Sequence, residues 1–159
     1  MIIGDSHGHI TNIKHVVGFA KKDNVSAIIH AGDWDTSEAV DAVTSFGIPL
    51  YTVLGNADVR PEVGERLKVK GKKFDDKFLI INLGGRKIGI THKPSDNKKY
   101  FLGKKLDLDL IVNGHLHSKY ESLETPIKII RPGAVIKGSN FAIFDTASNR
   151  VEFIEDVET

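Results

Sequence analysis

Three short apolar runs near the start of the chain alternate with two segments of helical periodicity, and each run ends in a polar or glycine-containing cluster. Apolar runs this short, bounded in this way, are typical of buried strands. Because strands and helices alternate, the pattern predicts an α/β fold with a parallel sheet and right-handed crossovers. We expect strands over 1–4, 25–30 and 50–54, with helices over 11–22 and from about 35 to 43.

The rest of the chain has a different pattern, in which strands come in pairs. Apolar runs on either side of Gly84-Gly85 are typical of a β-hairpin. The charged, glycine-containing stretch from Arg60 to Lys77 is expected to be a mobile loop. No linker or repeat divides the sequence, so we expect residues 1–159 to form a single domain. The other predicted elements are hairpin strands over 78–83 and 87–91, a helix over 95–106, and strands over 108–113, 126–130, 141–145 and 150–154.

The composition excludes several kinds of chemistry and of partner. The chain has no cysteine, which rules out disulfides, Cys-ligated zinc, iron–sulfur clusters and a thiol nucleophile. Its 22 basic and 21 acidic residues give a net charge of +1, so nucleic acid is not an expected partner. No apolar run reaches the roughly 20 residues of a membrane span, and the first residues do not resemble a signal peptide. We therefore expect a cytoplasmic protein without a membrane partner, and the sequence carries no signal of an oligomeric state.

Residues with metal-binding side chains follow five of the predicted strands. Side chains two positions apart, as in D-x-H and H-x-H, leave a strand on the same face and can grip one ion. Carboxylate, imidazole and amide groups without thiolates suit Mn, Ni, Zn, Fe or Mg, with manganese among the candidates. Seven such side chains are too many for one tetrahedral site, but they suit two divalent ions that share a bridging carboxylate. The predicted ligands are Asp5, His7, Asp33, Asn56, His92, His115 and His117.

The order of these motifs resembles that of a known family. D-x-H, G-D, G-N-x-D, a lone His and G-H-x-H follow one another as in the calcineurin-like metallophosphoesterases, and the chain looks like their small single-domain phosphodiesterases of bacteria and archaea. The resemblance runs from Asp5 to about Gly133 and implies a four-layer α/β/β/α sandwich. It also implies that one metal is held by Asp5, His7 and His117, a second by Asn56, His92 and His115, and that Asp33 bridges them.

The resemblance and the ligand set predict a dinuclear metal-dependent phosphoesterase that acts on a small phosphate-ester substrate, as a phosphodiesterase rather than a monoesterase. A hydroxide bridging the two ions would attack phosphorus in line. The expected catalytic residues are Asp33, Asn56 near the phosphoryl oxygens, and Asp58, which would orient a metal-bound group. The alternative is a non-catalytic protein-interaction scaffold with the same fold, and the short length and balanced charge disfavour a nuclease.

Four positions depart from the pattern that the resemblance implies. Ala57 stands where many larger relatives carry a His that stabilises the leaving group, which weakens the expectation of monoesterase activity. Lys93 and Arg131 stand where the family usually has Gly and Asn, and each is either an anion contact or an ordinary surface residue. Ala134 replaces a Ser.

Three histidines lie outside the predicted ligand set. His30 ends an apolar strand and is expected to be a buried residue that orients a ligand. His9 either orients a ligand or faces the substrate, and His15 is expected on the surface of a helix.

Overall fold

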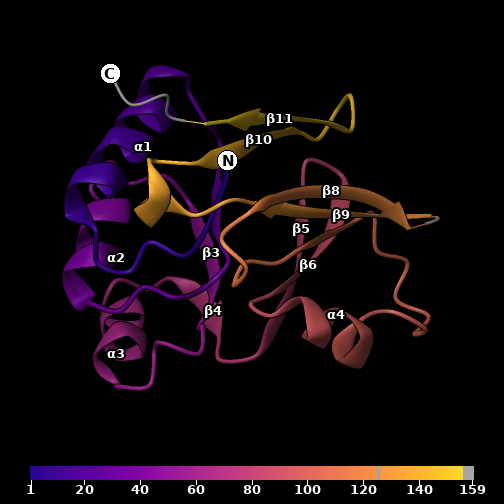
Figure 1. Ribbon diagram of the computed structural model, residues 1–159, viewed down its shortest axis with the longest axis horizontal. Helices are drawn as coiled ribbons and strands as arrows, with labels where there is room; N and C mark the ends of the chain where they lie inside the picture. Colours follow the sequence, from indigo (N-terminus) through magenta and orange to yellow (C-terminus); the bar gives the residue numbers. More distant parts are fainter. Residues whose placement is uncertain (125, 156–159) are drawn as a thin grey trace.

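The first sheet contains the parallel strands that the start of the sequence predicts. The computed structural model describes residues 1–124 and 126–155, and Figure 1 shows the chain coloured along its length. Strands β1 to β4 run parallel, and β10 pairs antiparallel with both β1 and β11, in the order β11-β10-β1-β2-β3-β4. The strands are β1 (Ile2–Ile3), β2 (Ile28–His30), β3 (Leu50–Val53), β4 (Lys73–Asp75), β10 (Phe141–Asp145) and β11 (Arg150–Ile154).

The second sheet is built around the predicted hairpin. Its turn, Gly84-Gly85, has φ angles of 54° and 76°, which glycine adopts without steric cost. The order is β5-β6-β7-β9-β8, with β6, β7 and β9 parallel and the two edge strands antiparallel to their neighbours. The strands are β5 (Phe78–Leu83), β6 (Arg86–Thr91), β7 (Leu110–Val112), β8 (Lys119–Glu124) and β9 (Ile127–Pro132).

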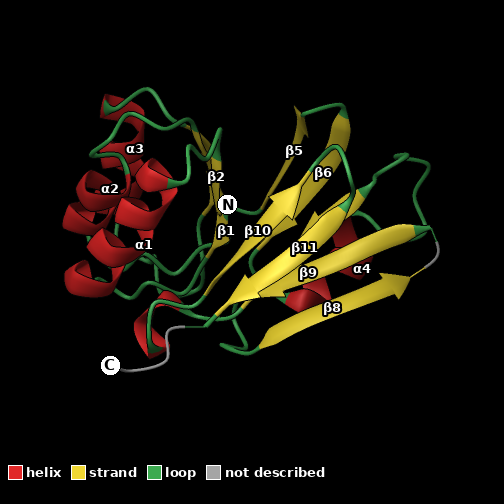
Figure 2. Cartoon of the chain, turned by 90° about the horizontal axis from the view of Figure 1, so that it is seen from above, coloured by secondary structure: helices red, strands yellow, loops and turns green. Residues whose placement is uncertain are grey.

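Helices cover the outer face of each sheet, and the two sheets pack against each other (Figure 2). Val16 and Ala20, at helical spacing in α1, are buried against the first sheet. Ile29 and Val112 belong to the apolar core between the sheets. The four-layer α/β/β/α fold is therefore confirmed. The helices are α1 (Ile10–Lys22), α2 (Ser37–Val43) and α3 (Glu62–Val69) outside the first sheet, α4 (Pro94–Tyr100) outside the second, and a short 3₁₀ helix η1 (Val135–Lys137).

Two sequence-based expectations were wrong, and one strand was missed. The stretch from Arg60 to Lys77 is not a loop but contains α3 and β4, because Val63 and Leu67 are buried on one face of an otherwise charged helix. Strand β8 was not predicted, because this edge strand carries charged residues that interrupt the alternation of apolar and polar side chains. The helix expected over 95–106 ends at Tyr100, and Phe101 turns inward to pack under the second sheet.

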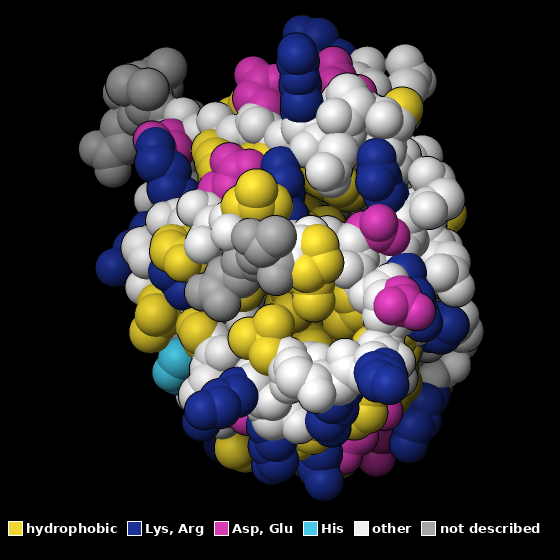
Figure 3. All heavy atoms as spheres, turned by 90° about the vertical axis from the view of Figure 1, so that its right-hand side faces the viewer, with side chains coloured by type: hydrophobic (Ala, Val, Ile, Leu, Met, Phe, Trp, Pro, Cys, Tyr) yellow, Lys and Arg dark blue, Asp and Glu magenta, His cyan; other side chains and the backbone are white. Residues whose placement is uncertain are grey.

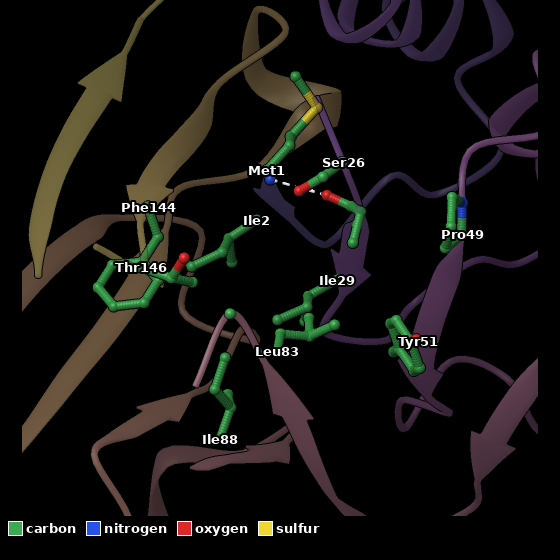
Figure 4. Close-up of a pocket in the computed structure, with 12 residues that line it drawn as sticks. Met1, Ile2, Ser26, Ile29, Pro49, Tyr51, Leu83, Ile88, Phe144 and Thr146 are labelled. Carbon is green, nitrogen blue, oxygen red and sulfur yellow. Dashed lines mark hydrogen bonds between the residues drawn. The ribbon is translucent and has the colours of Figure 1, made fainter. Parts of the chain in front are cut away.

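The amino ends of the first three strands border an apolar pocket of about 390 Å³ between the sheets (Figure 4). Its lining includes Ile29, Tyr51, Ile88 and Phe144, and none of its lining residues carries a carboxylate or an imidazole. The lining of this pocket therefore lacks the carboxylates and imidazoles that a metal site uses.

Apolar side chains also reach the surface at the end of the second sheet where β8 turns into β9. Figure 3 shows this end, with apolar side chains gathered between lysines and arginines. Leu123, near this end of the edge strand β8, is 69% exposed, and Tyr120, at the other end of the same strand, is 41% exposed. None of the helices in the described part of the chain combines the length and apolar character that crossing a membrane requires.

Candidate metal centre

The carboxyl ends of β1, β2, β3, β6 and β7 meet at one edge of the two sheets, as parallel strands require. The loops that follow these five strands carry the predicted ligands, and the structure brings their side chains together. Two groups of ligand atoms form, and each draws on loops of both sheets. The groups are Asp5, His7 and His117, and Asp33, His92 and His115.

The first group joins the end of β1 to the loop after β7. The Nε2 atoms of His7 and His117 lie 3.2 Å apart, and His117 Nε2 lies 3.7 Å from an Asp5 oxygen. Asp5 is fully buried and accepts hydrogen bonds from the backbone N–H of His115 at 3.0 and 3.1 Å. Two imidazole nitrogens and a carboxylate that converge so closely present lone pairs to one point, as ligands of a cation do.

The second group joins the end of β2 to those of β6 and β7, and Asn56, after β3, lies beside it. His92 Nε2 lies 3.3 Å from Asp33 Oδ2 and 2.9 Å from Asn56 Oδ1. The imidazole of His115 packs edge-on against that of His92, with ring centroids 5.1 Å apart. The amide of Asn56 is thus placed as a further oxygen donor beside this group.

Asp33 lies between the two groups. Its Oδ2 is 3.6 Å from His7 Nε2 and 3.3 Å from His92 Nε2, while its Oδ1 accepts the Ala57 N–H at 2.8 Å. A carboxylate in this position can contribute to both groups at once. The donor set of carboxylates, imidazoles and one amide fits two divalent ions of the borderline-to-hard class.

Burial and mutual contacts perturb the pKa values of these ligands. Burial raises the pKa of Asp5 to about 6. Burial alone would raise the pKa of Asp33, but hydrogen bonds from His92 and the Ala57 N–H hold it below its ordinary value. Burial would likewise lower the pKa of His92, yet the hydrogen bond to Asp33 raises it. Opposing shifts within one cluster are typical of functional sites.

The backbone is strained at most of the predicted ligands. Asp5, His7, Asp33, His115 and His117 all have φ between 42° and 73°, in the left-handed region that residues with a Cβ avoid. Such strain costs of order 1–3 kcal/mol per residue and concentrates at functional sites. It follows that the fold, rather than local preference, holds these loops in a ligand-presenting shape.

Glycines allow the loops to approach one another. A Cβ on Gly32 would lie 2.8 Å from both the Gly55 N and the His92 Nδ1. A Cβ on Gly55 would overlap the side chain and backbone of Asp33. Both glycines are therefore required by the close packing of the loops.

Asp58 and Asp35 support the ligands without belonging to either group. The Asp58 carboxylate accepts backbone N–H groups of Asp33, Trp34, Asp35 and Gly55 at 2.8–3.0 Å, and so ties the loop after β2 to the loop after β3. Both oxygens of Asp35 lie 3.1 Å from His7 Nδ1, which fixes the orientation of that imidazole. Asp35 follows Asp33 at the same spacing as the D-x-H pair, but it was not among the predicted site residues.

His30 is buried among the ligand loops. Its Nδ1 accepts the Gly32 N–H at 3.1 Å, so its Nε2 carries the proton and donates to Ser6 Oγ at 3.0 Å. Burial lowers the pKa of His30 to about 3, and the ring stacks on Trp34 with centroids 3.6 Å apart. A neutral His30 therefore braces the loops that carry Asp5 and Asp33.

The remaining histidines and departures belong to neither ligand group. His9 is exposed and caps α1, its Nδ1 accepting the Asn12 N–H, and His15 is exposed on the same helix. Lys93 precedes α4 and lines a pocket with Asn56 and His92. Arg131, near the end of β9, and Ala134, just after that strand, are both buried.

The four-layer fold and the ligand-bearing edge are those of a metallophosphoesterase-type sandwich. The chain belongs to the calcineurin-like phosphoesterase superfamily, whose domain model matches residues 1–149. This confirms the family predicted from the motifs.

Individual relatives agree with this assignment. The phosphodiesterase MJ0936 of Methanocaldococcus jannaschii is 25% identical over 139 residues, which cover 83% of this chain and 81% of the relative. A solved archaeal phosphodiesterase superposes with a TM-score of 0.84 at 24% identity and 97% coverage of both chains. The structure of Yfce, a phosphoesterase from E. coli, has a TM-score of 0.68 at 14% identity, covering 98% of this chain and 97% of its own. These two structures share the fold.

Proposed function

We propose that the chain is a metal-dependent phosphoesterase that hydrolyses small phosphodiesters at a centre of two divalent ions. The observation that carries the proposal is the position of Asp33, whose Oδ2 lies within 3.6 Å of His7 Nε2 and 3.3 Å of His92 Nε2. A carboxylate shared by two ligand groups is the arrangement that a two-metal phosphoryl-transfer site needs. Membership of the superfamily and the relative named a phosphodiesterase support the reaction class.

The residues of the site have two proposed roles: some would bind the ions, and others would position the ligands. Ions bound in the two groups would supply Lewis-acid charge to the phosphoryl group and turn water into a nucleophile. Asp58 would act as a positioning residue, because its oxygens are occupied by backbone N–H groups. The proposed ligands are Asp5, His7 and His117 for one ion and Asn56, His92 and His115 for the other, with Asp33 bridging and manganese as the first ion to test.

Two neighbouring positions bear on the choice of substrate. Asn56 is exposed at the rim, so its amide N–H can donate to a phosphoryl oxygen while its Oδ1 faces His92. Ala57 offers no side-chain acid to protonate a leaving group. Esters whose leaving groups depart without a proton are therefore the best substrates under this proposal.

Hydrolysis of bis-p-nitrophenyl phosphate tests the proposal directly. Metal-stripped protein should be inactive and should regain turnover with Mn²⁺, Ni²⁺ or Mg²⁺. Asp33→Asn should reduce turnover by about 10²-fold or more, whereas Asp23→Asn at the exposed end of α1 should not change it. Two bound ions without turnover of any phosphate ester would contradict the proposal.

A protein-interaction scaffold is the second candidate, and the exposed side chains of Leu123 and Tyr120 on the edge strand β8 favour it. Both candidates have the same fold, so the fold does not separate them. Stoichiometric metal binding with no hydrolysis of diesters or monoesters would select the scaffold.

A further inference from the structure

A pocket of about 430 Å³ lies on the outer face of the second sheet, between α4 and the strands β8 and β9. Lys98 of α4, Asn113 after β7, Tyr120 of β8 and Arg131 of β9 are among its lining residues. None of the seven proposed metal ligands lines it, so it is a separate place in the molecule.

Arg131 brings a buried positive charge to this pocket. Arg131 is 8% exposed. Its Nε donates to the Ser118 carbonyl at 2.8 Å, and its guanidinium lies 5.1 Å from the centre of the Tyr120 ring. It forms no ion pair with a carboxylate of the described residues, and burial lowers the pKa of its guanidinium. The charge of Asp5 acts on it from a distance, but no carboxylate of the described residues contacts it, so an anion in the pocket would stabilise it.

Asn113 adds an unsatisfied acceptor on the same face. Val112 pairs with Ile130, which places the next residue of each strand, Asn113 and Arg131, side by side. Asn113 is 1% exposed, and its Oδ1 has no hydrogen-bond partner in the part of the chain that the structure describes. A buried acceptor of this kind requires an O–H or N–H donor.

The two requirements together favour a ligand that combines a negative charge with a hydrogen-bond donor. An ionised carboxylate or a sulfate can neutralise Arg131 but has no proton to donate to Asn113. A phosphate group has both a negative charge and, near or below its second pKa of about 6 in esters, a P–O–H donor. Lys98, exposed at the rim, adds a further positive charge for such a group.

We propose that this pocket binds a singly protonated phosphate group, as inorganic phosphate or as a small phosphate monoester, independently of the metal centre. Arg131 and Lys98 face the charged oxygens, and Asn113 Oδ1 accepts the P–O–H. The pocket adjoins the centre through one segment, since Arg131 holds Ser118, the residue after His117.

The test is calorimetric titration of the metal-stripped full chain with inorganic phosphate and with glycerol phosphate at about pH 6. Arg131→Met should weaken phosphate binding at least about tenfold. Lys98→Glu should weaken it several-fold, whereas Lys99→Glu, the next residue on the same helix and outside the pocket, should not. Because Lys98 is exposed, its variant tests the site even if Arg131→Met does not fold. Sulfate should bind at least about tenfold more weakly than phosphate.

Several results would overturn the proposal. One is a phosphate affinity that neither Arg131→Met nor Lys98→Glu changes, and another is equal affinity for sulfate and phosphate. A third is loss of phosphate binding in His7→Ala, which would show that the anion binds at the metal centre instead. Tighter binding of glycerol phosphate than of inorganic phosphate would support a monoester ligand, and equal binding would support the phosphate group alone. All these measurements are made without metal, so they do not depend on the proposed hydrolysis.

Discussion

Asp58→Asn should destabilise the protein although it preserves the shape of the side chain. Asp58 Oδ1 accepts two backbone N–H groups, from Trp34 and Asp35, and Oδ2 accepts two more, from Asp33 and Gly55. An amide replaces one oxygen by an NH₂ group, which faces two donors and can bond to neither. Hydrogen bonds to a charged acceptor contribute about 1.5–3 kcal/mol each, and partial access of water reduces the loss, so we expect about 2–4 kcal/mol in total.

Urea denaturation of the metal-stripped protein measures this loss as a change in the free energy of unfolding. For a chain of this length it corresponds to a fall in Tm of roughly 4–16 °C. Because Asp58 positions Asp33, the affinity for Mn²⁺ should also fall, by about 10–100-fold. Asp23→Asn is the control, since its carboxylate accepts none of these N–H groups. An Asp58→Asn protein within about 0.5 kcal/mol of the parent, with unchanged Mn²⁺ affinity, would refute this interpretation of the loop.

Three further predictions concern the centre. Asp35→Asn should reduce Mn²⁺ affinity about 10–100-fold in calorimetry by releasing the imidazole that Asp35 orients, and an unchanged affinity would contradict this. Gly55→Ala should abolish metal binding, whereas Gly18→Ala, with open space around its Cβ, should leave it intact. Burial raises the pKa of Asp5 to about 6, so the fold favours the protonated form of this carboxyl. As the pH rises through 6 and the carboxyl ionises, the free energy of unfolding falls by about 3 kcal/mol. Asp5→Asn should therefore stabilise the metal-free protein at pH 7 but not at pH 4 in urea denaturation, while it removes metal binding; equal effects at both pH values would argue against this origin.

The sequence predicts the helices and strands that have a strong hydrophobic periodicity. It also predicts the site residues that directly follow parallel strands. The hairpin strands over 141–145 and 150–154 match β10 and β11, because alternation and a polar turn define them locally. The predicted ligands come together at one edge because parallel strands deliver their carboxyl ends to the same side. No long-range information beyond the strand order is needed for that result.

The remainder depends on contacts that the local sequence does not encode. Helix α3 buries only Val63 and Leu67 among charged residues, so its apolar face becomes visible only against the first sheet. Strand β8 is defined by pairing with β9 rather than by its own period. The contact between Asp35 and His7 spans 28 positions and depends on the left-handed backbone of both residues, which no pattern predicts.

Each ligand group draws its side chains from both sheets: Asp5 and His7 follow a strand of the first sheet, whereas His117 follows a strand of the second. A bound ion would therefore act as a cross-link between the two inner layers, at the edge where their loops meet. Loading with metal should raise the resistance of the whole fold to heat and to proteases, by an amount that grows with the logarithm of the ion concentration divided by its Kd. Stripping should speed amide hydrogen exchange first at the carboxyl ends of β1, β2 and β7, before the apolar core between the sheets opens.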